Sequence, residues 1–100
     1  MDEILKTTGY KFAQYGWSHA PKGDYGVWGD YGANDLNADD IHAEKAVTGY
    51  VDYFTRDASG TPKTTIESAL DNGQIAWYLN SIQYEEDTGY IHYEWVYEHG

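Results

Sequence analysis

The chain has no cysteine, two prolines, two phenylalanines and six basic residues among its 100 residues. The absence of cysteine excludes disulfides and thiolate metal sites, and it is compatible with a reducing compartment. The six basic residues face 17 acidic ones, so the formal net charge is -11. Such a surface repels a phosphate backbone, and tight binding of DNA or RNA is therefore not expected. No apolar run approaches the length of a membrane span or of a signal-peptide core.

Tyrosine and tryptophan are abundant, in contrast to phenylalanine. The sequence contains 11 Tyr and 4 Trp, and aromatic residues make up 17% of it. Both side chains combine a large apolar body with a polar atom, which suits partly solvated sheet faces and protein interfaces. A domain of this size cannot bury all of these rings. We therefore expect some of them on the surface, where aromatic patches usually mark contacts with other molecules.

Hydrophobic periodicity and turn residues predict a single α+β domain that spans residues 1–100. Consecutive strands follow one another at hairpin distance, so we expect a mostly antiparallel sheet of four to five strands. The main helix should pack on one face of that sheet, and a short helix should precede it at the N-terminus. The expected elements are helix Asp2–Thr8, strands Tyr10–Trp17 and Tyr25–Trp28, loop Tyr31–Asp40, strand His42–Arg56, a helix from Thr61-Pro62 to Asn72-Gly73, and strands Ala76–Glu85 and Tyr90–Glu98.

Side-chain alternation is strictest in the last predicted strand, which should have one apolar and one charged face. The main helix should carry one apolar stripe, because its large apolar residues recur three and four positions apart. Thr61 is the expected N-cap of this helix, with Pro62 at its first position. The apolar strand face consists of Ile91, Tyr93, Trp95 and Tyr97, and the helix stripe consists of Ile66, Ala69 and Leu70.

Asp87-Thr88-Gly89 matches the short signature of the aspartic proteases. That chemistry needs two carboxylates that share a proton in a desolvated site. Here the triplet follows two glutamates and lies between two alternating strands, where Asp and Gly are typical of a tight turn. A hairpin turn is the preferred interpretation, and no catalytic residue is predicted.

No metal or cofactor site is predicted either. Asp35-x-Asn37-x-Asp39 begins like a calcium loop. An EF-hand then requires Gly at the sixth position and Glu at the twelfth, and these positions hold Asp40 and Ala46. His42 has carboxylates nearby in the sequence, but such a histidine on a polar strand face is more often solvated than a ligand.

Several segments carry a resemblance to a known family over nearly the whole chain. They are TTGYKFAQYGW, ANDLNADDIHAEKAVTGYVDYFTRD, TIESAL and AWYLNSIQYEEDTGYIHYEWVYE. The most specific pieces are ADDIHAEK, which leads into GYVDYFT, and YEEDTGYIHYEW. Together they resemble the tail terminator (tail completion or minor capsid-type) proteins of long-tailed bacteriophages and prophages. None of these segments is a catalytic motif.

This resemblance implies an α+β subunit that closes into a ring, which is hexameric in that family. Such a ring caps the tail tube and joins it to the head-side connector or stopper protein. The implied partners are other copies of the chain, the tail tube protein and the connector. The implied location is the head-proximal end of the virion tail, after assembly in the host cytoplasm. DNA would pass through without specific binding, which an acidic lumen favours.

The expected function is therefore that of a virion structural protein that is not an enzyme. Three alternatives stay open: another head–tail joining or stopper protein, a monomeric acidic adaptor or inhibitor-like binding module, and, third, a small hydrolase. Rings form through heterologous contacts, so free strand edges and the Tyr31–Asp40 loop are candidate surfaces. The candidate contact residues are Trp28, Tyr31, Leu36 and Ile41.

Overall fold

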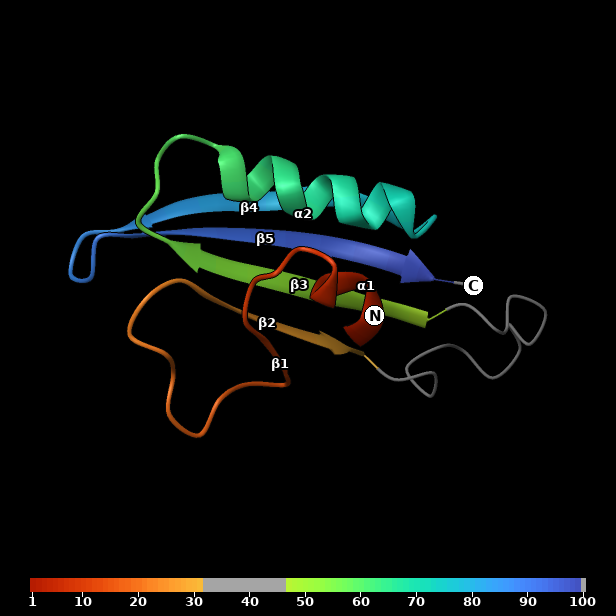
Figure 1. Cartoon of the computed structure of the whole chain (residues 1–100), viewed down its shortest axis with the longest axis horizontal. Helices are drawn as coiled ribbons and strands as arrows, with labels where there is room; N and C mark the ends of the chain where they lie inside the picture. The colour runs from red at the N-terminus through yellow and green to blue at the C-terminus, as the bar shows by residue number, and fades with distance from the viewer. Residues whose placement is uncertain (32–46, 100) are drawn as a thin grey trace.

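The computed structural model describes residues 1–31 and 47–99 and shows an α+β fold, as the sequence predicts. Five strands form one sheet in the order β1-β2-β3-β5-β4. Four of the strands are joined by antiparallel ladders, and the ladder between β1 and β2 is parallel. The elements are α1 (Asp2–Lys6), β1 (Phe12–Gln14), β2 (Tyr25–Asp30), β3 (Val47–Thr55), α2 (Thr61–Asn72), β4 (Ala76–Glu85) and β5 (Tyr90–His99) (Figure 1).

One face of the sheet carries the core, and both helices pack on it. The alternation of β5 places its odd-numbered rings on this face, as predicted, where they pair with the buried residues of β3. Leu5 of α1 and both Ile66 and Leu70 of α2 complete the same cluster. At about 25 cal/mol per Å² of apolar surface buried, such a cluster is the main favourable contribution to folding. Its members are Leu5, Trp28, Val51, Tyr53, Ile66, Leu70, Ile75, Tyr93, Trp95 and Tyr97.

The first two strands differ from the expected hairpin. β1 is limited to three residues, and it pairs with β2 in parallel, with Ala13 opposite Val27. Tyr15 and Gly16 follow β1 with φ angles of 66° and 136°, so the chain leaves the strand through a left-handed bend. The indole of Trp17 then donates a hydrogen bond of 2.8 Å to the carbonyl of Gly26. This contact ties the connection to β2 and lets the chain return in the same direction as β1.

Helix α1 is shorter than predicted. It ends at Lys6, since the hydroxyls of Thr7 and Thr8 donate 2.6 Å hydrogen bonds back to the carbonyls of Ile4 and Leu5. Side chains of this kind compete with the backbone for partners near helix ends. The two threonines therefore cap the C-terminal end of α1 instead of extending it.

Helix α2 has the predicted apolar stripe and the predicted end at Gly73, but not the predicted N-cap. Gly60 is the N-cap residue, with a φ of 88°, and Thr61 is the first residue of the helix. The Ser59 hydroxyl accepts a hydrogen bond of 3.2 Å from the backbone N–H of Thr61. Gly is acceptable at an N-cap, and here its conformation allows the sharp entry into the helix.

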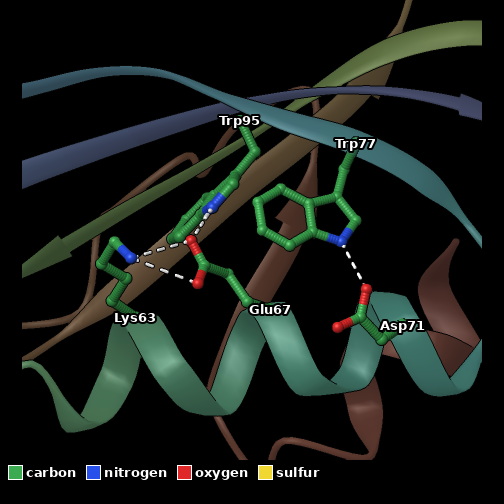
Figure 2. Close-up of polar contacts among 5 residues, drawn as sticks. All are labelled: Lys63, Glu67, Asp71, Trp77 and Trp95. Atoms are coloured by element: carbon green, nitrogen blue, oxygen red, sulfur yellow. Dashed lines mark hydrogen bonds and ion pairs between the residues drawn. The ribbon is translucent and has the colours of Figure 1, made fainter.

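Two tryptophans connect α2 to the sheet through polar contacts (Figure 2). The indole of Trp95 donates a hydrogen bond of 3.0 Å to Glu67, whose carboxylate also pairs with Lys63 at 3.1 Å. Asp71 lies one helical turn after Glu67, and it accepts a hydrogen bond of 2.8 Å from the indole of Trp77. Trp95 is fully buried, so its N–H needs a partner inside the protein. These two bonds fix the rotation of α2 over β5 and β4.

The predicted loop Tyr31–Asp40 and the predicted strand His42–Arg56 lie partly outside the described residues. Tyr31 is described, and residues 32–46 are not. Within the described part, the strand runs from Val47 to Thr55.

Candidate functional site

The outer side of β4 is the longest strand edge that no described strand covers. β4 is ten residues long and lies at one end of the sheet, whereas the opposite end is formed by the three-residue β1. Its sequence, AWYLNSIQYE, contains no proline and has one charged residue, Glu85, at its end. Proteins usually protect such an edge from pairing with another chain by charges, prolines or short length. Over its first nine residues, β4 has none of these three protections, and its one irregularity is the β-bulge described next.

A β-bulge at Asn80 divides β4 into two parts. The register shifts between Leu79 and Ser81, so that Leu79 pairs with Trp95 and Ile82 pairs with Tyr93. Because the bulge inserts one residue, the side-chain alternation reverses after it. Tyr78 therefore lies on the face away from the helices, and Ile82 and Tyr84 lie on the helix face.

Ile82 and Tyr84 form an exposed apolar surface that we call the hairpin patch. Figure 1 shows that the β4–β5 hairpin extends beyond the N-terminal end of α2. The helix therefore leaves this end of the sheet open, and the two side chains are 53% and 66% exposed. Together with Tyr78, they account for three of the five large hydrophobic residues that are exposed in the described part of the chain. Exposed apolar groups gathered on one strand indicate a contact surface.

The face of the sheet opposite the helices, here called the open face, carries tyrosines and acids in alternating cross-strand rows. One row runs from Tyr78 through Val96 to Tyr50, and the next from Glu94 to Asp52. Tyr31 extends from the end of β2 and lies with its ring centroid 5.7 Å from that of Tyr50. None of the described helices covers this face, since both pack on the core side. The residues of the open face used below are Tyr15, Tyr31, Thr48, Tyr50, Asp52, Tyr78, Glu94, Val96 and Glu98.

Carboxylates lie near the tyrosines of the open face and affect their pKa values. The pKa of Tyr31 is raised above 10.0, first by desolvation and then by the charges of Glu94 and Asp52. The pKa of Tyr50 is also raised, first by desolvation and then by the charge of Asp52. Each tyrosine is thus held in its neutral form, which can stack on a cation and donate a hydrogen bond.

His92 compensates part of this charge farther along the open face. Its Nε2 lies 3.5 Å from Oδ1 of Asp52, and its Nδ1 lies 3.9 Å from Glu85. Its ring stacks on Phe54 with centroids 4.2 Å apart. The interaction with Asp52 raises the pKa of His92 above 6.5, and partial burial opposes this. The contact is long for a hydrogen bond, so the pair is held mainly by charge when His92 is protonated.

The four predicted contact residues have different surroundings. Trp28 is 8% exposed and belongs to the core, and its indole nitrogen has no hydrogen-bond partner among the described residues. Tyr31 is 46% exposed on the open face. Leu36 and Ile41 lie outside the described residues. Trp28 is thus unavailable at the surface of the single chain, and Tyr31 is the member of the set that the structure places on a candidate surface.

Sequence reasoning did not single out Tyr78, Ile82 and Tyr84. The signal that could have found them is the lack of charge along β4, which is unusual for a strand at the end of a sheet. That signal has meaning only if β4 is known to lie at the end of the sheet. The order of the strands depends on pairing between distant residues, which the sequence does not reveal.

The two motifs that suggested chemistry have simple structural settings. Asp87-Thr88-Gly89 forms the turn of the β4–β5 hairpin, where Gly89 has a φ of 79° and Asp87 is exposed. The carbonyl of Thr88 accepts a 2.8 Å hydrogen bond from the guanidinium of Arg56. The calcium-like segment lies outside the described residues, and no group of three possible metal ligands occurs within the described ones.

Comparisons with known proteins add no family assignment. No protein-family model matches the chain, and a search of curated proteins finds no match. Within residues 1–31 and 47–99, neither helix has the length and apolar character needed to cross a bilayer.

Proposed function

We propose that this chain is a structural protein of a phage virion, a tail terminator that caps the tail tube as a ring and joins it to the head-side connector. In this proposal the protein acts through protein contacts and carries out no catalysis. The sequence segments that resemble this family support the proposal, and the surface of the sheet supplies a physical basis for the contacts.

The observation that carries the proposal is the long outer edge of β4, which has no proline and no charge before Glu85, with the adjacent hairpin patch. A ring needs heterologous contacts, in which one surface of a subunit meets a different surface of its neighbour. The sheet has exposed aromatic groups at both ends: Tyr84 at the β4 end, and Tyr15, which is 60% exposed, next to β1 at the other. Contact between these two ends would repeat from one subunit to the next and could close into a ring.

Co-assembly with tail tubes is the direct test. The chain would be expressed with the tail tube protein encoded near it, and a gold-labelled tag on the chain would be located by electron microscopy. The proposal predicts label at one end of each tube. Label along the tube, unlabelled tubes, or the absence of tube and connector genes from the neighbourhood would contradict it. Label on the connector side of isolated heads would instead indicate the neighbouring joining or stopper role.

A monomeric acidic binding module is the second candidate, and the open face favours it. An acidic surface with exposed tyrosines can bind a basic partner without any ring. The two candidates differ in their need for the β4 edge. A module would keep its function after charges are placed at the hairpin patch, whereas a ring subunit would lose it.

A further inference from the structure

A hollow of about 280 Å³ lies on the open face, where β3, β5 and β4 run side by side. Its lining includes Thr48, Glu98 and Ala76, which form one cross-strand row, and Val96 and Tyr78 from the next row. Tyr78 is 57% exposed, so its ring stands at the side of the hollow as an accessible wall. The hollow is thus lined by the aromatic ring of Tyr78, the apolar side chain of Val96 and the carboxylate of Glu98.

The surroundings of the hollow are acidic and rich in tyrosine. Glu94 lies in the next row, where one of its oxygens accepts a hydrogen bond of 2.9 Å from Asn80, a neutral partner that leaves its charge intact. The rings of Tyr31 and Tyr50 lie nearby, tilted by 40° to each other. Lys63, one of the described basic residues, pairs with Glu67 on the helix side of the sheet.

Other cations of the described chain are also engaged away from the hollow. Lys6 pairs with Asp2 on α1 at 3.2 Å. The guanidinium of Arg56 lies 4.0 Å from the ring centroid of Tyr90, near the hairpin end of the sheet. This last contact shows that the sheet already holds one guanidinium on a tyrosine ring.

We propose that this hollow binds an arginine side chain of a partner protein, so that the open face is a docking surface for a basic, extended protein segment. The guanidinium would stack on Tyr78 and pair with Glu98, while neighbouring basic residues would face Glu94. Arginine fits this combination better than lysine, because its planar group stacks on aromatic rings and binds carboxylates in two-point contacts. The net charge of -11 adds long-range attraction for such a segment.

This inference does not depend on the ring. It uses Tyr78 and Glu98 on the open face at the β4 end of the sheet. The proposed ring contact uses Ile82 and Tyr84 on the helix face of β4, and Tyr15 beside β1 at the opposite end of the sheet. A chain that forms no ring could still bind arginine, and a ring subunit could fail to do so. The two proposals can therefore be tested and rejected separately.

The test is an NMR titration of the isotope-labelled full chain with a capped peptide that contains two arginines separated by glycine. We expect saturable shift changes at Thr48, Tyr78, Val96 and Glu98. The same peptide with citrulline in place of arginine, which keeps the shape and removes the charge, should produce none. Raising the salt concentration should weaken binding, because exposed charges are screened.

Matched variants separate the hollow from general acidity and aromaticity. Tyr78→Ser and Glu98→Gln should each weaken arginine binding by roughly two- to fivefold, the range expected for one exposed cation–π contact or ion pair. Tyr84→Ser and Glu86→Gln remove the same groups from exposed positions near the hairpin, and they should leave binding unchanged. The four spectra also report whether each variant is folded.

Several outcomes would overturn the proposal. These are equal binding of the citrulline peptide, shift changes centred outside the hollow, equal losses in the control variants, or no saturable change at millimolar peptide. Shifts of the same residues that grow with protein concentration in the absence of peptide would assign the open face to a second copy of the chain instead.

Discussion

The contact between Glu67 and Trp95 allows a quantitative prediction about how α2 is held on the sheet. In Glu67→Ala, the buried indole N–H of Trp95 loses its acceptor (Figure 2). Leaving a buried donor unsatisfied costs about 1–3 kcal/mol. Loss of the ion pair with Lys63 adds about 0.3–0.5 kcal/mol, and the better helix propensity of alanine returns a similar amount. We expect the free energy of unfolding to fall by about 2 kcal/mol.

Asp71→Ala is the matched control, because Asp71 accepts the same kind of bond from Trp77. That bond is exposed to water, which can replace the lost acceptor. Asp71 also lies in the last turn of α2, where the helix dipole disfavours a negative charge. Removing this charge therefore offsets part of the stability that is lost with the hydrogen bond. We expect a change within about 0.5 kcal/mol.

Urea unfolding followed by tryptophan fluorescence and by circular dichroism would measure both variants. Glu67→Gln keeps an acceptor oxygen and should lie between them. Equal destabilisation by Glu67→Ala and Asp71→Ala would refute the argument, since burial of the indole N–H is the difference on which it depends. A loss below about 0.5 kcal/mol for Glu67→Ala would refute it as well.

Two further predictions concern the interior and the pH dependence of the sheet. Gly49→Ala should destabilise the fold by about 3 kcal/mol in urea unfolding, at the upper end of the usual range for overpacking, because a Cβ there would overlap the backbone oxygen of Gly29 and the ring of Tyr97; a loss below about 1 kcal/mol would mean that these strands separate easily. His92 has a raised pKa, so its pair with Asp52 should stabilise the fold fully below pH 6.5 and progressively less as the pH rises through the raised value. His92→Gln should remove this dependence from urea midpoints measured between about pH 6 and 9, and an unchanged pH profile would contradict the assignment.

The parts of the fold that depend on local pattern could be predicted from the sequence. The boundaries of β4 are as predicted, and β5 extends the prediction by one residue, to His99. The alternation that leads from Ile91 to Tyr97 defines the core face, and the apolar stripe with a closing glycine defines α2. These signals lie within one element, so neighbouring residues suffice to specify them.

Features that depend on contacts between distant residues could not be predicted. The parallel pairing of β1 follows from the bend at Tyr15 and from the bond between Trp17 and Gly26, and no local pattern specifies either. The bulge at Asn80 reverses the alternation of β4, so counting residues places Ile82 and Tyr84 on the wrong face. Trp28 suits a contact surface as well as a core, and only the position of β2 between β1 and β3 decides between them.

The central claim is that the β4 edge and the hairpin patch hold neighbouring subunits together. The most direct test of this claim is light scattering of the full chain over a range of concentrations, alone and with tail tubes. The wild type is compared with the double variant Ile82→Lys/Tyr84→Lys. Thr64→Lys/Ser68→Lys adds the same charge on the exposed side of α2 and serves as the control. We predict a closed assembly of several subunits for the wild type and the control, and a folded monomer for the edge variant. A wild type that stays monomeric under both conditions, or an edge variant that assembles like the wild type, would contradict the claim.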